Sequence, residues 1–394
     1  MIETVSSCNV CGSSSIDQVI DLPSLPLTGL YYPNLTLALK SSTFDQGLCL
    51  CTKCGHCQLS NVIDPSVVYD ETYTHRSSES PLSRNGNDFL FKYITKSIAL
   101  SASDCVLEAG CNDGYLLDKL YSFNSLPQYY GFDPIWLSNK PPEKNFSIFG
   151  SFIEDVNPKL QGINPTLIIS AHTFEHVVSL RDSLLLLVEK AAKDARIIIE
   201  MPSFDSLIRL KRFDQIFHQH IQYISENSIF ELCNQLSCTL NNIAYNYSYW
   251  GGTVILDFSK KPSIKSVSPF SAKQKRLSIE SSYNDFLLSI NSVANSLHNC
   301  LDVSYLGAAQ MLPILHYHVK DSISFNRVLD DNPKRIGTFL PNLDLPIEPL
   351  SSHLSSSSSP ASFIIGAVDS TRALVSRTRE LNIPNVFTFF NSLI

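Results

Sequence analysis

The sequence predicts an α/β protein in which a small cysteine-rich module precedes two α/β domains. Three observations support this fold class. Two Cys-x-x-Cys pairs lie within the first 54 residues, short apolar runs alternate with amphipathic stretches from residue 105 onward, and a weaker alternation follows residue 300. Strands and helices that alternate at this spacing are typical of a doubly wound parallel sheet.

The composition is that of a globular protein with a modest negative charge. The 394 residues are 44% hydrophobic and 17% charged, with a net charge of −7. This balance excludes a nucleic-acid binder steered by bulk positive charge. No apolar run approaches the roughly 20 residues of a membrane span, and the first residues lack the basic and apolar regions of a secretory signal. We therefore expect a cytoplasmic protein without nucleic-acid or membrane partners, and the sequence leaves its oligomeric state open.

Residues 1–75 are predicted to form a loop-rich, zinc-binding module. Cys8 and Cys11 form one pair, and Cys51 and Cys54 form the other. Thiolates at the two ends of such a tight turn can both reach one tetrahedral zinc ion at about 2.3 Å. Four thiolates fill the coordination shell, so we expect a structural ion. Unpaired buried cysteines and a redox pair are the alternatives, and His56 or Cys57 could replace one of the four ligands.

Residues 76–260 are predicted to form the central domain. Apolar runs predict strands at 105–108, 129–133, 166–170 and 196–200. Apolar residues at helical spacing predict helices at 85–100, 115–121 and 183–192.

The turn after the first strand carries the cofactor signal. It reads Glu108-Ala109-Gly110-Cys111-Asn112-Asp113-Gly114, and a predicted helix follows it. Gly110 and Gly114 let the backbone approach a ligand closely, and the helix N-terminus offers free N–H groups. This pattern resembles motif I of the class I S-adenosylmethionine (SAM) methyltransferases. Asp133 follows about 20 residues later, where such a site needs an acid for the ribose hydroxyls. A plain tight turn with structural glycines is the alternative.

Residues 261–394 are predicted to form a C-terminal Rossmann-like α/β domain. A long amphipathic helix is expected at 274–298, and strands are expected at 303–307, 325–330, 363–367 and 386–390. The serine-rich stretch 351–359 is predicted to be a surface loop.

Three further clusters hold residues suited to chemistry. One runs from Tyr73 to Ser80 and another from Ser170 to His176. The third runs from Phe213 to His220 and is followed by Tyr249-Trp250-Gly251-Gly252. Each has a purely structural alternative: the histidines could be satisfied core residues, and the two glycines could form an ordinary hairpin turn.

In this order, and behind the four-cysteine module, the clusters resemble the C-methyltransferases that act on nucleotide-linked 4-keto-deoxysugars. The resemblance covers nearly the whole chain and is weakest after Asp302, where the lysine expected after the glycine turn is absent. It implies a class I SAM methyltransferase fold, a structural zinc ion, SAM as cofactor and a nucleotide sugar as substrate. It also implies that the C-terminal domain holds the nucleotide.

The resemblance assigns roles to individual residues. His220 stands where the family has its base, which removes a proton beside the ketone so that the enolate carbon attacks the methyl group. Tyr73 is expected to stabilise the enolate oxygen, and His218 is expected to assist. The expected cofactor-binding residues are Glu108, Gly110, Asn112, Gly114, Asp133 and His172.

Two residues depart from the family pattern Tyr-x-Glu-His. Phe217 replaces the tyrosine and Gln219 replaces the glutamate, so a proton donor and a negative charge beside the base are both lost. An O- or N-methyltransferase on the same scaffold is therefore an alternative. A non-catalytic protein that binds SAM and zinc is a second alternative.

Overall fold

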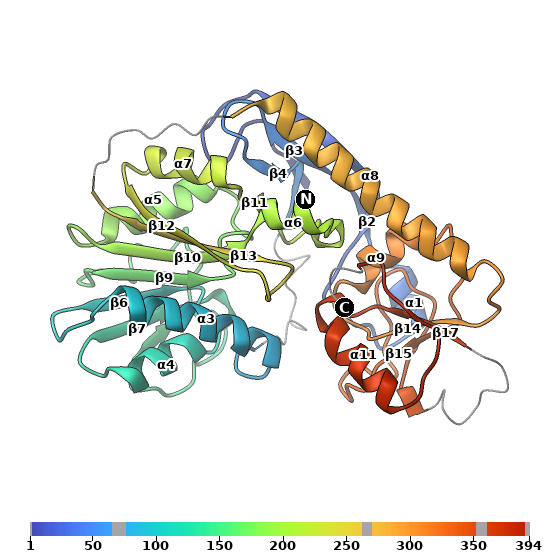
Figure 1. Ribbon diagram of the computed structural model, residues 1–394. Helices are drawn as coiled ribbons and strands as arrows, with labels where there is room; N and C mark the ends of the chain where they lie inside the picture. The colour runs from blue at the N-terminus through green and yellow to red at the C-terminus, as the bar shows by residue number, and fades with distance from the viewer. Residues whose placement is uncertain (1, 65–75, 262–269, 352–360, 391–394) are drawn as a thin grey trace.

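The computed structural model describes residues 2–64, 76–261, 270–351 and 361–390. Figure 1 shows two lobes, one around a seven-stranded sheet and the other around a five-stranded sheet. The N-terminal strands lie between the lobes, and the long helix α8 (Ala272–Leu297) runs from these strands to the C-terminal lobe. Tyr73 and almost all of the predicted serine-rich loop lie outside the described residues.

The N-terminal module is built on an antiparallel sheet, although its composition predicts mainly loops. Its strands, in sheet order, are β11 (Gln222–Tyr223), β4 (Cys57–Leu59), β3 (Thr43–Cys51) and β2 (Ile16–Pro26). A separate pair joins β1 (Ile2–Thr4) to β5 (Asn61–Ile63), and α1 (Leu35–Leu39) follows β2. Because β11 comes from the chain of the central domain, the two parts share a sheet.

The central domain contains the predicted doubly wound sheet. Its order is β12 (Thr239–Asn246), β13 (Thr253–Ser259), β10 (Arg196–Pro202), β9 (Leu167–Ala171), β6 (Cys105–Ala109), β7 (Gln128–Phe132) and β8 (Ser147–Phe149). The strands from β10 to β8 are parallel, whereas β13 is antiparallel to both of its neighbours. The chain runs outward from β6 to β8 and then returns to β9, so the strand order reverses between β6 and β9. Ligands of doubly wound sheets bind at this reversal, beyond the carboxyl ends of the strands.

Helices cover both faces of this sheet, which explains why its strands are continuous apolar runs. The covering helices are α3 (Pro81–Ser97), α4 (Tyr115–Phe123), α5 (Leu180–Lys190) and α7 (Glu226–Gln235). Successive side chains of a strand point to opposite faces. Accordingly, Val106 packs in one core cluster with residues of α3 and α4, and Leu107 packs in another with residues of α5 and α7.

The C-terminal domain contains the second predicted sheet. Its five parallel strands are β16 (Ile347–Glu348), β15 (Arg327–Leu329), β14 (Val303–Leu306), β17 (Ser362–Ile365) and β18 (Val386–Phe387). Its helices include α9 (Leu312–Val319) and α11 (Thr371–Glu380). One core cluster contains Leu48 of β3, Phe286 of α8 and Tyr305 of β14, so the N-terminal module packs against this domain through α8.

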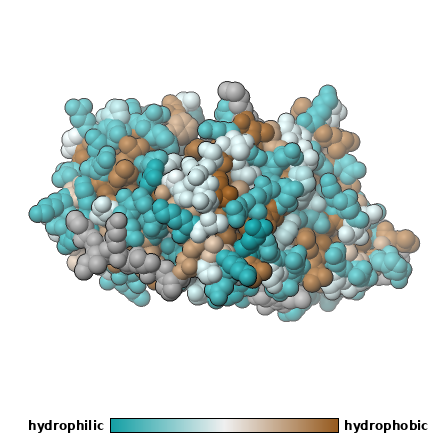
Figure 2. All heavy atoms as spheres, turned by 90° about the horizontal axis from the view of Figure 1, so that it is seen from above, coloured by the Kyte–Doolittle hydropathy of each residue, from teal (hydrophilic) through white to brown (hydrophobic). Residues whose placement is uncertain are grey.

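The molecular surface is mixed in character. Seen from above, it is mostly hydrophilic, with hydrophobic spots scattered among polar side chains (Figure 2). None of the helices in the described ranges is both long enough and apolar enough to cross a membrane.

Candidate active site

The four predicted zinc ligands meet at one point of the N-terminal module. The Sγ atoms of Cys8, Cys11, Cys51 and Cys54 all lie within 4.8 Å of one another. Two of the separations, Cys8–Cys54 and Cys11–Cys51, are 3.6 Å. A tetrahedral ion with zinc–sulfur bonds of about 2.3 Å requires sulfur atoms about 3.8 Å apart. The side chains therefore fit a four-thiolate zinc site without rearrangement.

The two halves of this site are the same turn used twice. Gly12 follows the first cysteine pair and Gly55 follows the second, with φ of 71° and 75°. Each glycine N–H donates a 2.9 Å hydrogen bond to the carbonyl of the first cysteine of its pair. The candidate replacement His56 is engaged elsewhere, because its Nε2 atom lies 2.8 Å from Oε1 of Gln222.

The predicted cofactor turn connects β6 to α4 at the reversal of strand order. Gly110 and Gly114 have φ of 72° and 78°, and Asn112 between them has φ of 46°. A side chain at Gly110 would collide with Thr173, since a Cβ atom there would lie 2.0 Å from the threonine Oγ1. The turn thus places backbone without side chains, at Gly110 and Gly114, at the carboxyl edge of the sheet, as a cofactor site requires.

Two carboxylates flank this turn. Asp133 follows β7, and its Oδ2 atom accepts a 2.8 Å hydrogen bond from the N–H of Asn112. Its Oδ1 atom accepts from the N–H of Ile135 at 3.0 Å. Glu108 at the end of β6 is buried, which raises its pKa well above the usual range. Oε2 of Glu108 has no hydrogen-bond partner among the residues that the structure describes. An unpaired polar atom buried at this turn fits a site that a polar cofactor completes.

The chain just after Tyr73 lies on the cofactor turn. The N–H of Ser77 donates to Oδ1 of Asn112 at 3.0 Å, and the N–H of Ser78 donates to Oδ2 of Asp113 at 3.1 Å. Tyr73 itself lies outside the described residues, so its expected role remains a prediction.

His220 lies in a buried cluster next to this edge of the sheet. Donor atoms of Glu175, His176 and His220 lie within 4.8 Å of one another. The His176 and His220 ring centres are 5.0 Å apart, and the ring of Phe217 lies 4.1 Å from that of His220. Burial and the neighbouring His176 lower the pKa of His220 well below its usual range. The imidazole is therefore neutral at pH 7, with a free lone pair on one ring nitrogen.

His172 joins the cluster from the carboxyl end of β9. It follows β9 with φ of 52°, and its Nδ1 atom lies 3.0 Å from Oε1 of Glu175. Burial alone would raise the pKa of Glu175, but the hydrogen bond from His172 and the nearby imidazoles lower it to about 2. Nε2 of His172 is buried and has no hydrogen-bond partner within the described part of the chain. Glu175 is therefore a buried anion beside the two histidines at 176 and 220.

The predicted segment Tyr249-Trp250-Gly251-Gly252 places a further aromatic ring beside His220. Trp250 and Gly251 both have positive φ, and the N–H of Gly252 donates to the carbonyl of Tyr249 at 2.8 Å. These features make a hairpin turn between β12 and β13. The same turn brings the ring of Trp250 within 5.9 Å of the His220 ring centre and within 6.2 Å of the His172 ring centre.

His218 and Gln219 point toward the N-terminal module instead of toward His220. Nε2 of His218 donates to the carbonyl of Leu25 at 3.0 Å, and its Nδ1 accepts from Gln46 at 3.3 Å. Gln219 exchanges two hydrogen bonds with Thr28, at 2.8 and 3.1 Å. The structure thus does not bring His218 to the candidate base. Thr28 could not be recognised from the sequence, since nothing in its neighbourhood points to residue 219.

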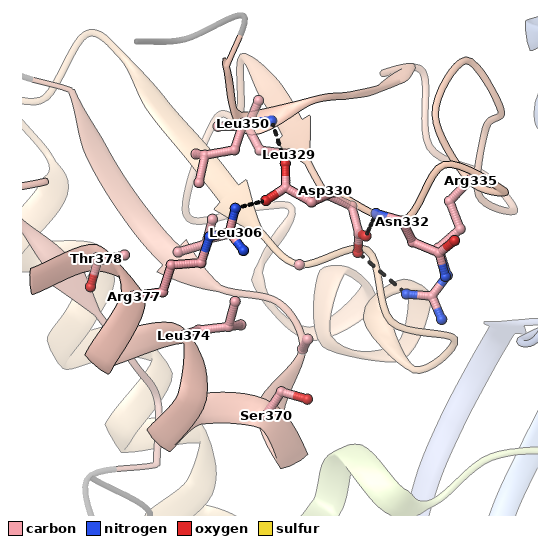
Figure 3. Close-up of a pocket in the computed structure, with 13 residues that line it drawn as sticks. Leu306, Leu329, Asp330, Asn332, Arg335, Leu350, Ser370, Leu374, Arg377 and Thr378 are labelled. Atoms are coloured by element: carbon pink, nitrogen blue, oxygen red, sulfur yellow. Dashed lines mark hydrogen bonds and ion pairs between the residues drawn. The ribbon is translucent and has the colours of Figure 1, made fainter. Parts of the chain in front are cut away.

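The C-terminal domain has a pocket of about 250 Å³ at the carboxyl ends of its strands. Figure 3 shows Arg377 and Arg335 on opposite sides of this pocket, with Asp330 between them. Asp330 follows β15 and accepts from the N–H of Ala308 at 2.7 Å and from the N–H of Asn332 at 2.7 Å. Asp133 has the same pair of backbone contacts in the central domain.

An ion-pair network joins the pocket side of the C-terminal domain to the loop of the candidate base. Arg212 is buried and binds both oxygens of Asp214 at 2.8 and 2.9 Å. It also binds Asp369, at 2.9 and 3.3 Å. Asp369 precedes Ser370, which lines the pocket. Arg212 immediately precedes the predicted cluster 213–220, but no local pattern marks its partner 157 residues away.

Comparisons with known proteins match two segments of the chain to known domains. Residues 8–69 match a family described as "Putative zinc binding domain", and residues 81–240 match a family described as "Methyltransferase domain". C-methyltransferase NovU of Streptomyces niveus is 24% identical over 234 residues, which cover 58% of this chain and 55% of that protein. The chain thus spans about half the length of this curated relative.

Two methyltransferases are among the solved structures to which part of the chain is similar. Magnesium protoporphyrin IX methyltransferase ChlM from Synechocystis is 15% identical with a TM-score of 0.35, covering 46% of this chain and 83% of that one. N-methyltransferase NodS from Bradyrhizobium japonicum is 16% identical with a TM-score of 0.33, covering 47% and 90%. The two domain matches and the similarity to a C-methyltransferase confirm the resemblance seen in the sequence. They show that the chain contains a methyltransferase domain behind a zinc-binding module.

Proposed function

We propose that this chain transfers the methyl group of SAM to a ring carbon of a nucleotide-linked deoxy-ketosugar, with His220 as the base. The observation that carries the proposal is the buried cluster of His220, His176 and Glu175 beside the cofactor turn. A carbon-bound proton beside a ketone can be removed by a base held against it, and a neutral imidazole suits this step. The similarity to a C-methyltransferase supports carbon as the acceptor.

The cofactor would lie against the turn after β6. Gly110, Asn112 and Gly114 would supply the close backbone, and Asp133 and Glu108 the carboxyl groups. Asp133 already accepts two backbone hydrogen bonds, and a carboxylate has capacity for further donors such as ribose hydroxyls. We assign His172 to the same site because its buried Nε2 atom has no hydrogen-bond partner in the described ranges. When bound, SAM supplies an electrophilic methyl group.

The proton transfer would be carried out by this chain's own residues. His220 takes the proton onto its neutral ring, and the electron pair of the broken C–H bond remains on the sugar as an enolate. The Glu175 carboxylate then stabilises the imidazolium, since opposite charges attract strongly in a buried site. Tyr73 remains the proposed donor to the enolate oxygen. His218 is left out of the proposed step because it is hydrogen bonded to Leu25 and Gln46.

The nucleotide would occupy the C-terminal pocket. Parallel sheets of this type bind nucleotides at the carboxyl ends of their strands, and an acid after the second strand is suited to ribose hydroxyls. Asp330 has that position, and Arg335 and Arg377, which form ion pairs with Asp330 and Asp331, place two cations at the pocket for phosphate oxygens. Lys334, next to Arg335, lies 3.5 Å from Glu79 of the segment that covers the cofactor turn. A substrate bound here would therefore extend from the pocket toward the cofactor.

We also propose that the zinc module stabilises the position of the loop that carries His220. Thr28 holds Gln219, and β4 of the module pairs with β11 directly after His220. A four-thiolate zinc site needs reduced cysteines, so we also propose a cytoplasmic location.

One observation favours O-methylation as a second candidate. Phe217 covers a face of the His220 ring at 4.1 Å, and its side chain has no proton to donate to an enolate oxygen. An acceptor hydroxyl needs a base but no such donor.

The test is methyl transfer to a panel of nucleotide-linked 4-ketosugars, with mass-spectrometric fragmentation of the product. We expect one added methyl group on a ring carbon. We expect His220→Ala to abolish turnover and to leave SAM affinity within about twofold, because His220 contacts the substrate side of the site. Methylation on oxygen would support the second candidate, and full activity of His220→Ala would refute the assigned base.

A further inference from the structure

We infer that Glu175, His176 and His220 form a second metal site, for a divalent transition-metal ion such as Zn²⁺, and that the ion inhibits the transferase. The inhibitory part rests on the proposed function, because it requires His220 to be the base. The metal-binding part stands on geometry alone.

Glu175, His176 and His220 offer three donor atoms suited to a transition-metal ion. One carboxylate oxygen and two imidazole nitrogens lie within 4.8 Å of one another, and His176 Nε2 lies 3.9 Å from Glu175 Oε1. Two histidines and one carboxylate are a common ligand set of zinc and of other transition metals. Bonds of about 2.1 Å in a tetrahedral site place donors about 3.4 Å apart. Small side-chain rotations would therefore close the cluster on an ion.

The second argument is the orientation of His176. Its Nδ1 atom donates a 2.7 Å hydrogen bond to the carbonyl of Gln219. This bond fixes the tautomer and leaves the lone pair on Nε2, which faces Glu175. Histidine ligands of metals almost always donate their second ring N–H in this way.

The third argument is the unpaired oxygen of Glu175. The residue is 0% exposed and its Oε1 is hydrogen bonded to His172, while its Oε2 has no hydrogen-bond partner among residues 2–64, 76–261, 270–351 and 361–390. A buried carboxylate oxygen without a donor is costly, and a cation would satisfy it. His172 would then support the ligand from behind, as outer-shell partners of metal ligands do.

Backbone hydrogen bonds join the loop that carries Glu175 and His176 to the loop that carries His220. The N–H groups of Ile221 and Gln222 both donate to the carbonyl of Glu175, at 2.7 and 3.0 Å. Residue 175 is therefore fixed relative to residue 220 before any ligand binds. His176 keeps 31% of its side chain exposed, which gives an ion access to the cluster.

Inhibition follows from the chemistry of the base. A ring nitrogen that donates its lone pair to a metal cannot also take a proton from the substrate. The ion would differ from the structural one in its ligands, because this site offers nitrogen and oxygen where the N-terminal site offers four sulfurs. Soft thiolates and imidazoles also favour zinc or cobalt over magnesium or calcium at both positions.

The experiment is a Co²⁺ titration of the full chain that already holds one zinc ion. We expect one further equivalent to bind, with the visible absorption of nitrogen and oxygen ligation and without a thiolate charge-transfer band. Glu175→Gln and His176→Ala should each lose this equivalent and should retain the first ion. His298→Gln removes an exposed imidazole at the end of α8 and serves as the matched control, so it should bind Co²⁺ like the wild type.

Activity is measured on the same samples. We expect methyl transfer by the wild type to fall at least tenfold as the second site fills, and to recover when a mild chelator removes that ion. Failure of the wild type to bind a second equivalent, or its retention in both variants, would overturn the metal site and leave the proposed function untouched. Binding with unchanged or increased activity would overturn the inhibition and would separately count against His220 as the base.

Discussion

Thr28 provides a sharp test of how the zinc module holds the candidate base. Its hydroxyl donates to Oε1 of Gln219 at 2.8 Å, and Nε2 of Gln219 donates to the Thr28 carbonyl at 3.1 Å. Thr28 is 1% exposed and Gln219 is 8% exposed, so water cannot replace either contact readily. Gln219 immediately precedes His220. The substitution Thr28→Val keeps the shape of the side chain and removes only the hydroxyl group.

Thr28→Val is expected to lower stability because Oε1 of Gln219 loses its hydrogen-bond donor. Oε1 of Gln219 would be buried without its donor, which costs about 1–3 kcal/mol. Thr28→Ser is the matched control, because it keeps the hydroxyl and loses one methyl group, at about 0.8 kcal/mol. We also expect kcat of the valine variant to fall by about tenfold, because small misplacements of a catalytic group can cost up to roughly a hundredfold. SAM affinity should not change.

Urea denaturation measures the stability, initial rates at saturating SAM measure kcat, and calorimetric titration measures SAM affinity. We expect the valine variant to be less stable and slower than the serine variant. If the two variants unfold at the same urea concentration and turn over at the same rate, Thr28 does not position the loop. If Thr28→Val lowers SAM affinity as well as kcat, the substitution disturbs the whole domain and not only the loop that carries His220.

Three further predictions concern the zinc site, the interdomain ion pair and a buried histidine. Cys51→Ser should lose its zinc and melt at a lower temperature, because a hydroxyl is a poor zinc ligand; a zinc-free variant of wild-type stability would contradict this. Asp369→Asn should destabilise the chain by about 1–2 kcal/mol, since Arg212 loses a charged hydrogen-bond partner; an unchanged denaturation midpoint would be inconsistent with that. Burial lowers the pKa of His218 to about 4, so only the unfolded chain takes up this proton between pH 6.5 and 4. Wild-type stability should therefore fall relative to His218→Gln by up to about 1.4 kcal/mol per pH unit over that range, and parallel stability curves would refute the buried neutral imidazole.

Local sequence patterns were sufficient for much of the fold. The cysteine pairs, each followed by a glycine, specify a turn that needs only neighbouring residues. The strands of the central sheet are continuous apolar runs because helices cover both of its faces, and β6 (Cys105–Ala109) and its glycine turn were predicted for that reason. The N-terminal sheet was missed because prolines and polar residues interrupt its strands.

The arrangement around His220 could not be predicted in the same way. His218 and His220 are two residues apart, so a strand or an extended loop would place them on one side. In the structure the N–H of His220 donates to the carbonyl of Phe217 at 3.0 Å. This tight turn sends the two imidazoles in different directions. Thr28 and Gln219 are 191 positions apart, and only packing between domains brings them together.

The most direct test of the central claim is solvent deuterium exchange at the carbon beside the substrate ketone. Nuclear magnetic resonance follows the exchange for a nucleotide-linked 4-ketosugar incubated with the enzyme in deuterated water, without methyl donor. The account predicts that the wild type exchanges one α-proton and that His220→Ala, at equal substrate occupancy, does so at least a hundredfold more slowly. Methyl transfer by the wild type without any such exchange, or equal exchange by both proteins, would contradict proton removal by His220.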